Sequence, residues 1–312
     1  MIKKIAVIGT GVIGSGWIAR CLAHNKEVIA YDKDLKLEKK LISEIKRSWP
    51  FIKKLFNKKK LNLKNFKYVT SIEEAVKDAD FIQECATENY AIKTKLMNTI
   101  GKYAKPNAII SSSSSGLLPT RIYSKCKNPA RTMIGHPFNP VYLCPGVEIV
   151  AGKKSKKKFL NKANKFYKSI SMNPIMVKKE LPGYLADRLQ EALWREGLHI
   201  INEGYATTKD LDRAIEDGPG LRWSLMGTFL TFHLAGGKAG MKHMLKQFGP
   251  ALKLPWTKLK APKLSKKLSS RVIAGTRQQA KGKSVAMISN IRDEYLVNLQ
   301  KLRKKYEIKI RK

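Results

Sequence analysis

The sequence predicts an α/β protein in which a domain with a mostly parallel sheet is followed by an all-helical domain. Two observations predict this order. Apolar, strand-like runs alternate with helical patterns over the first half of the chain, and helical stretches dominate after Pro182. A chain of 312 residues, 43% of them hydrophobic, can bury the cores of two domains. We place the boundary near Leu181, so that residues 1–180 form the first domain and residues 181–312 the second.

Each strand of the first domain is expected where a short apolar run lies between turn residues. These runs are Ile5–Ile8, Glu27–Tyr31, Tyr68–Thr70, Phe81–Gln83, Ala108–Ile110, Thr132–Ile134, Val147–Ala151 and Pro174–Val177. Helices are expected between them at Gly14–His24, Leu35–Phe56, Ile72–Val76, Ala91–Tyr103 and Ser155–Ile170. Because the links are short, we expect a parallel sheet covered by helices on both faces.

The helix at Leu35–Phe56 is unusually long for a connection between two strands. Its apolar residues recur at helical spacing, which predicts one buried face. Pro50 is expected to break or kink the helix near Trp49, and the basic stretch Asn57–Lys64 to extend it as a projecting arm.

The second domain is expected to begin with a helix at Pro182, because proline is favoured at the first helical position. The helices that follow are expected to be interrupted by glycine and proline residues. These breaks are Gly218-Pro219-Gly220, Gly236-Gly237 and Gly249-Pro250.

The chain carries 62 basic and 24 acidic residues, a formal net charge of +38. Nucleic-acid binding is the first interpretation of such a charge. However, the basic residues are spread along the chain and most are lysine, which lacks the arginine fork that reads base edges. We therefore interpret them as solvated surface charge and expect no nucleic-acid partner.

The four cysteines are scattered without a metal-binding spacing, which predicts a reduced, cytoplasmic protein without a metal. No apolar run reaches the 18 or so residues that span a bilayer, so no membrane association is expected.

A glycine-rich turn follows the first predicted strand and opens the first predicted helix. Its residues are Gly9, Thr10, Gly11, Val12, Ile13 and Gly14. In a Rossmann-type domain such glycines allow a tight turn, close approach to a pyrophosphate and packing of the helix on the strand. Asp32 closes the second strand, where its carboxylate would accept hydrogen bonds from a ribose and repel a 2′-phosphate. The motif therefore predicts NAD as the cofactor, in preference to NADP.

His136 lies in the stretch Gly135-His136-Pro137-Phe138-Asn139-Pro140, twelve residues before Glu148. Histidine is the side chain best suited to exchange a proton near neutral pH. A carboxylate that holds one ring nitrogen leaves the other free to act on a substrate. The prolines predict that His136 lies on a stiff loop after the strand, with Glu148 as the carboxylate that orients it.

Together these motifs resemble the 3-hydroxyacyl-CoA dehydrogenase superfamily and, within it, the branch that acts on L-carnitine. The similar stretches are GTGVIGSGWIAR at Gly9–Arg20, GLLP at Gly116–Pro119, GHPFNPVYL at Gly135–Leu143, ALWREG at Ala192–Gly197 and GLRWSLMGTFLT at Gly220–Thr231. The resemblance implies an NAD-dependent enzyme with His136 as the catalytic base, Glu148 as its orienting carboxylate and Ser115 as the partner of the substrate oxygen. It also implies cofactor contacts for Glu88, Lys93 and Asn139, and a homodimer formed through the helical domain.

Three residues are candidates for substrate binding. Asp187 stands where the acyl-CoA branch has asparagine, so we expect it to place negative charge near a quaternary ammonium group. Trp194 lies seven residues later on the same helix face, where it could make a cation–π contact or simply pack in the core. Arg222 has the geometry to bind the substrate carboxylate or to form a surface ion pair.

The expected reaction is the oxidation of L-carnitine to 3-dehydrocarnitine. Two alternatives in the same superfamily stay open, namely a 3-hydroxyacyl-CoA or L-gulonate as the substrate. A nucleic-acid-binding protein on a dehydrogenase fold is disfavoured, because such a protein would not need Ser115, His136 and Glu148 together.

Overall fold

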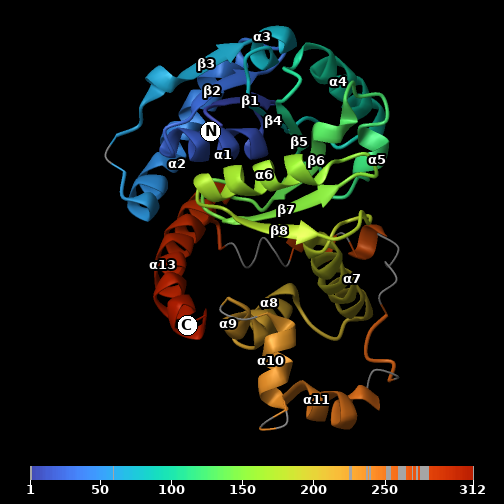
Figure 1. Ribbon diagram of the computed structural model, residues 1–312. Helices are drawn as coiled ribbons and strands as arrows, with labels where there is room; N and C mark the ends of the chain where they lie inside the picture. Colours follow the sequence, from blue (N-terminus) through green and yellow to red (C-terminus); the bar gives the residue numbers. More distant parts are fainter. Residues whose placement is uncertain are drawn as a thin grey trace. The chain divides into compact units, whose positions relative to one another are not determined.

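The computed structural model describes residues 2–58, 60–224, 227–236, 238, 240–250, 254–258, 265–268, 270–271, 273–274 and 281–311. The chain divides into two compact units, Met1–Arg188 and Leu189–Lys312. The first unit contains the sheet, and the elements described in the second unit are helices (Figure 1). This arrangement confirms the predicted fold class.

An eight-stranded sheet forms the centre of the first unit (Figure 1). Its strands are β1 (Lys4–Ile8), β2 (Glu27–Tyr31), β3 (Phe66–Val69), β4 (Phe81–Glu84), β5 (Ile109–Ser112), β6 (Thr132–Pro137), β7 (Gly146–Ala151) and β8 (Asn173–Val177). They lie in the order β3-β2-β1-β4-β5-β6-β7-β8. Every neighbouring pair is parallel except β6 and β7, which are antiparallel. The carboxyl ends of β1, β4, β5 and β6 therefore share one edge with the start of β7.

Apolar side chains of the strands alternate between the two faces of the sheet. Ala6 and Ile8 of β1 belong to a buried cluster that includes residues of α3 (Ile72–Val76), α4 (Tyr90–Tyr103) and α5 (Pro119–Ile122). Phe81 of β4 stacks on Phe166 of α6 (Lys157–Ser169), at 4.2 Å between ring centroids. The other helices of this unit are α1 (Val12–Ala23) and α2 (Leu37–Phe56).

Helix α2 buries the face that the apolar spacing predicts, including Leu41, Ile45, Trp49 and Ile52. Two expectations for this region are wrong. The expected break at Pro50 is wrong, because the helix continues through this exposed residue, whereas the expected kink stays a prediction. The projecting arm is absent too, since Asn57 adopts a left-handed conformation that ends the helix and a short 3₁₀ turn follows at Leu63–Asn65.

Helix α7 (Ala186–Glu203) begins at the end of the first unit and continues into the second. It starts later than Pro182, because Gly183 and Tyr184 adopt positive φ angles of 71° and 42° and form a turn before it. The second unit also contains α8 (Thr208–Glu216), α9 (Pro219–Trp223), α10 (Thr228–Ala235), α11 (Gly240–Phe248) and α13 (Val285–Arg311). Helices end before Gly218, Gly236 and Gly249, as predicted, whereas Gly237 lies outside the described residues.

Within the described residues, no helix is both long enough and apolar enough to cross a membrane.

Candidate active site

The glycine-rich turn joins β1 to α1 at the carboxyl edge of the sheet. Gly9 has a φ of +101°, and a Cβ at Gly14 would lie 1.9 Å from the Gly9 carbonyl oxygen, so the tight turn requires both glycines. Gly11 differs, because a Cβ there would meet no atom within 4 Å. Gly11 is also the N-cap of α1, and no side chain caps the helix. The turn thus offers open space and helix amides, which suit the pyrophosphate of a dinucleotide.

Asp32 lies directly after β2, beside this turn. Its Oδ2 accepts hydrogen bonds from the Thr10 amide at 3.0 Å and the Thr10 hydroxyl at 2.9 Å. Its Oδ1 accepts one from the Lys33 amide at 2.9 Å. Asp32 therefore holds the glycine-rich turn against the second strand, at the position where the ribose of a dinucleotide would bind.

His136 and Glu148 face each other across the antiparallel pair β6 and β7, where they are direct register partners. Nδ1 of His136 lies 2.8 Å from Oε2 of Glu148. An ionised carboxylate can only accept a hydrogen bond, so Nδ1 carries the proton and Nε2 is left to act as a base. The predicted loop position of His136 is wrong: the histidine belongs to β6 because Glu148 on the neighbouring strand pairs with its backbone as well as with its ring.

The second oxygen of Glu148 holds the start of α7. Oε1 accepts hydrogen bonds from the amides of Leu185 at 2.9 Å and Ala186 at 3.1 Å. Burial raises the pKa of Glu148, but the hydrogen bonds from His136 and the two amides outweigh it, so the pKa lies below its usual value of 4.5. Glu148 is thus a permanent anion at neutral pH that links the imidazole to α7.

Asp187 lies in the first turn of α7, with Oδ2 3.8 Å from Nε2 of His136. The rings of Phe138 and Tyr184 flank the imidazole, with centroids 5.3 and 5.6 Å away. His136 is only 5% exposed. The imidazole therefore lies between two carboxylates and two aromatic rings.

Ser115 follows β5 at the same edge of the sheet and is exposed. Glu88 orients the backbone of its loop, because Oε1 accepts from the Ser114 hydroxyl at 2.6 Å and the Ser115 amide at 3.0 Å. The loop also adjoins the turn before α7, where the Tyr184 hydroxyl donates to Leu117 O at 2.6 Å. The structure thus brings the Ser115 loop to the turn that carries the ring of Tyr184 beside His136.

Lys93 is buried and engaged within the protein. Its Nζ donates to both carboxylate oxygens of Glu84, at 2.8 and 3.1 Å, and to Ala86 O at 2.9 Å. It also lies 3.5 Å from Oε2 of Glu88. The predicted contacts of Glu88 and Lys93 with the cofactor stay predictions. Glu84 was missed because an acidic residue at the end of an apolar run resembles a turn residue, although it is fully buried.

A buried polar network supports Gly135, the residue before the imidazole. The Tyr167 hydroxyl lies 2.9 Å from Oγ of Ser111 and donates to Oε1 of Gln83 at 2.8 Å. Gln83 in turn donates to Gly135 O at 3.2 Å. A Cβ at Gly135 would lie 1.9 Å from the Tyr167 hydroxyl oxygen, so only glycine fits. The sequence carried no signal for this network, since its four members lie on four separate elements.

The remaining candidate residues lie on exposed surface. Asn139, in the turn between β6 and β7, is exposed and precedes Pro140 through a cis peptide bond. Trp194 on α7 is 54% exposed, and Arg222 on α9 is also exposed. Trp194 and Arg222 belong to the second unit, and their contacts with substrate stay predictions.

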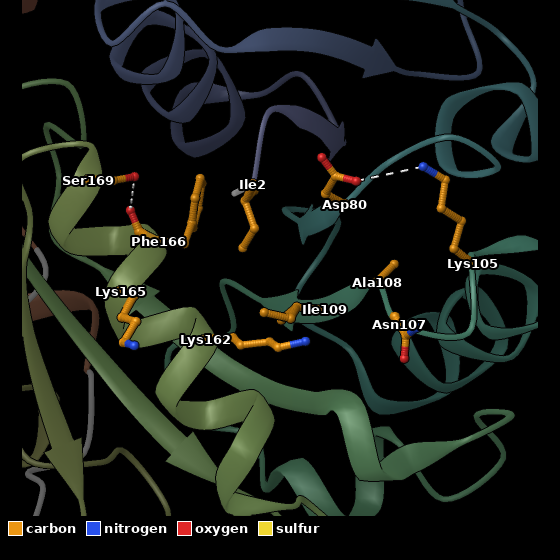
Figure 2. Close-up of a pocket in the computed structure, with 10 residues that line it drawn as sticks. All are labelled: Ile2, Asp80, Lys105, Asn107, Ala108, Ile109, Lys162, Lys165, Phe166 and Ser169. Carbon is orange, nitrogen blue, oxygen red and sulfur yellow. Dashed lines mark hydrogen bonds and ion pairs between the residues drawn. The ribbon is translucent and has the colours of Figure 1, made fainter.

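A cavity of about 480 Å³ lies at the opposite, amino-terminal edge of the sheet (Figure 2). It is lined by Ile2, Asp80, Lys105, Asn107, Ala108, Ile109, Lys162, Lys165, Phe166 and Ser169. Lys105 forms an ion pair with Asp80 at its rim, at 3.6 Å. None of the predicted site residues lines this cavity. Within the part of the chain that the structure describes, no cluster of three or more potential metal ligands occurs.

Two family models match the chain along most of its length. The model of the 3-hydroxyacyl-CoA dehydrogenase NAD binding domain matches residues 4–181, and that of the 3-hydroxyacyl-CoA dehydrogenase C-terminal domain matches residues 183–279. The chain belongs to the 3-hydroxyacyl-CoA dehydrogenase family. The family confirms NAD as the cofactor and an NAD-dependent dehydrogenase of 3-hydroxy acids as the class of enzyme.

Curated relatives within this family are similar along almost their whole length. The L-carnitine dehydrogenase of Oceanobacillus iheyensis is 50% identical over 297 residues, which cover 95% of this chain and 97% of the relative. The L-carnitine dehydrogenase of Pseudomonas putida is 50% identical over 296 residues, 95% of this chain and 92% of the relative.

Solved structures with the same 3-hydroxyacyl-CoA dehydrogenase fold are more distant in sequence. The NAD⁺-dependent 5-formyl-3-hydroxy-2-methylpyridine 4-carboxylic acid 5-dehydrogenase has a TM-score of 0.81 at 22% identity, covering 97% of this chain and 99% of its own. The (S)-3-hydroxybutyryl-CoA dehydrogenase of Ralstonia eutropha has a TM-score of 0.65 at 23% identity. The match covers 80% of this chain and 89% of that protein. At these identities the likeness shows the fold alone.

Proposed function

We propose that this enzyme oxidises L-carnitine to 3-dehydrocarnitine with NAD. The observation that carries the choice of substrate is the similarity to relatives named L-carnitine dehydrogenase, at 50% identity over 95% of this chain. The buried pair of His136 and Glu148 supports the choice of chemistry, because it leaves a proton acceptor at the same carboxyl edge of the sheet as the glycine-rich turn.

The proposed mechanism uses a proton acceptor and a positioned hydroxyl. Nε2 of His136 accepts the proton of the C3 hydroxyl, while the C3 hydrogen leaves as hydride and the carbon–oxygen bond becomes a carbonyl. NAD bound at the glycine-rich turn supplies the hydride acceptor. Glu148 stabilises the imidazolium, since its carboxylate lies 2.8 Å from Nδ1. Ser115 donates a hydrogen bond to the substrate oxygen, and the contacts of Glu88 hold its loop in place.

The helical unit supplies the proposed partners of the rest of the substrate. Arg222 binds the carboxylate of L-carnitine, for which the guanidinium is geometrically suited. Trp194 packs against the trimethylammonium group, where an aromatic face attracts a cation. Both side chains are exposed in the second unit and accessible to a ligand. We further propose a cytoplasmic enzyme that acts as a homodimer.

A substrate panel tests the proposed function. NADH absorbance at 340 nm is followed with L-carnitine, a 3-hydroxyacyl-CoA and L-gulonate as substrates, each with NAD. We expect kcat/KM for L-carnitine to exceed both others by about 100-fold or more, because selective sites discriminate by several kcal/mol. Faster oxidation of either alternative substrate would overturn the choice of L-carnitine.

The His136→Gln variant tests the base in the same assay. Glutamine keeps a polar side chain but accepts no proton, so kcat should fall by roughly 10²- to 10⁴-fold. Binding of NAD, followed by the quenching of tryptophan fluorescence, serves as the control and should change by less than about twofold. A kcat within threefold of wild type would show that another group is the base.

A further inference from the structure

His136 contacts a second carboxylate besides the one that orients it. Glu148 lies on Nδ1, whereas Oδ2 of Asp187 lies 3.8 Å from Nε2, the nitrogen that the proposed reaction requires. The Asp187 side chain is 30% exposed, in contrast to the fully buried Glu148. One carboxylate is therefore a fixed part of the protein interior, and the other lies where substrate and solvent can reach it.

The start of α7 is held in a way that fixes the position of Asp187. The amides of Leu185 and Ala186 donate to Oε1 of Glu148, and the preceding Tyr184 is fully buried with its hydroxyl on Leu117 O. Burial raises the pKa of the Tyr184 phenol, which stays protonated and donates. Asp187 also lies in the first turn of an 18-residue helix, where the helix dipole favours a negative charge. Its charge beside the imidazole is thus built into the fold.

The distance from Nε2 decides which part of a substrate Asp187 can contact. A 3-hydroxy acid that places its C3 hydroxyl on Nε2 has C4 one bond from the reacting carbon. A cationic nitrogen on C4 then lies about 3 to 4 Å from the hydroxyl oxygen, given bonds of about 1.5 Å. A carboxylate 3.8 Å from Nε2 is therefore within ion-pair reach of that nitrogen.

We infer that Asp187 selects substrates with a cationic group on C4. In the structure Oδ2 of Asp187 lies 3.8 Å from Nε2, and the two atoms do not pair, because Nε2 carries no proton and a carboxylate only accepts. A cationic group on C4 pairs with the Asp187 carboxylate, while the unprotonated Nε2 accepts the hydroxyl proton. A substrate with an uncharged group on C4 cannot pair with Asp187. It places apolar atoms against the carboxylate, and the desolvation of that charge is costly. This inference rests on the proposed function and adds the residue that excludes neutral 3-hydroxy acids.

The test compares two substrates of equal shape and different charge. The first is L-carnitine, and the second is 3-hydroxy-5,5-dimethylhexanoate, in which a tert-butyl group replaces the trimethylammonium group. We call the second compound the neutral substrate, because its group on C4 is uncharged. Wild type is compared with Asp187→Asn, which keeps the size of the side chain and removes its charge. Glu44→Gln is the matched control, since it removes one carboxylate charge from an exposed pair with Arg47 on α2. NADH formation gives kcat/KM, and inhibition of L-carnitine oxidation gives Ki where the neutral substrate turns over too slowly.

Asp187→Asn should lower kcat/KM for L-carnitine by roughly 10- to 100-fold and leave that for the neutral substrate unchanged or higher. The ratio between the two substrates should then fall by at least tenfold, whereas Glu44→Gln should leave it within twofold of wild type. An unchanged ratio in Asp187→Asn, or an equal loss with both substrates, overturns the inference, because the residue would then act only on His136 or on the fold. A wild-type enzyme inactive on L-carnitine overturns the proposed function itself, and this inference with it.

Discussion

Glu148 uses both oxygens of one carboxylate for different purposes. Oε2 holds the imidazole of His136, and Oε1 accepts the amides at the start of α7. A buried carboxylate without such partners would be costly, and here three donors satisfy it. The orientation of the proposed base and the position of α7 therefore depend on the same side chain.

Replacing Glu148 with glutamine should destabilise the protein in a pH-dependent way. Because the folded-state pKa of Glu148 lies below the usual 4.5, the ionised group contributes stability above about pH 4.5, and this contribution is lost as the pH falls through the folded-state pKa. Glu148→Gln should thus lower the free energy of unfolding by about 1–3 kcal/mol at pH 7. The difference from wild type should shrink below pH 4.5, as measured by urea denaturation across that range.

Glu44→Gln provides the comparison for this titration, because it removes an exposed carboxylate paired with Arg47. Its effect should stay below about 1 kcal/mol at every pH. A constant difference between Glu148→Gln and wild type from pH 3 to pH 7 would contradict the assignment of the ionised carboxylate as the stabilising species.

At the scale of elements, two glycines in the turn from β1 to α1 have different roles. A Cβ at Gly14 would collide with the Gly9 carbonyl oxygen, whereas a Cβ at Gly11 would enter open space. Gly14→Ala should therefore cost about 1–3 kcal/mol of stability through overpacking. Gly11→Ala should leave the melting temperature nearly unchanged and weaken NAD binding by roughly tenfold or more, since its methyl group enters the space for the pyrophosphate.

Thermal unfolding and calorimetric titration with NAD measure both effects in the same two variants. The control is built into the pair, because each variant adds one methyl group to the same turn. If Gly11→Ala binds NAD as tightly as wild type, the pyrophosphate does not approach that position.

The sequence predicted the eight strands of the sheet closely, because short apolar runs between turn residues have few alternatives. It failed at two positions where contacts with other elements determine the local backbone structure. Pro50 lies inside α2 because the buried residues on either side of it, Trp49 and Ile52, stabilise the helix across the proline. His136 belongs to β6 because β7 pairs with it, and this pairing joins residues twelve positions apart.

Part of the candidate site was predictable from the sequence, and part was not. The pairing of His136 with Glu148 follows from motif and chemistry, and the geometry agrees with it. The buried ion pair of Glu84 with Lys93 and the network beneath Gly135 were not predictable, because their members carry no motif and meet only in the folded sheet.

At the scale of the whole molecule, α10 suggests how the chain associates. Four large apolar side chains are exposed on this helix, namely Phe229, which is 85% exposed, Leu230, Phe232 and Leu234. Helices of this kind are normally covered. We therefore expect Phe229→Asp to weaken the proposed homodimer by roughly 30-fold or more, as loss of an interface hot spot does. Light scattering after size-exclusion chromatography over a range of protein concentrations gives the dissociation constant.

Lys209→Gln on α8 is the control, because it changes the charge by the same single unit at an exposed position. It should dissociate like wild type, and circular dichroism should show native helix content for both variants. A wild-type protein that is monomeric at micromolar concentration would contradict the homodimer.

The crowding around Gly135 has a consequence for the order in which this chain can accept substitutions. The Tyr167 hydroxyl and Oγ of Ser111 occupy the space that any larger residue at position 135 would need. A larger residue at position 135 would therefore need smaller residues at positions 111 and 167 first. A substitution at position 135 alone would displace the backbone beside the imidazole and impair the enzyme.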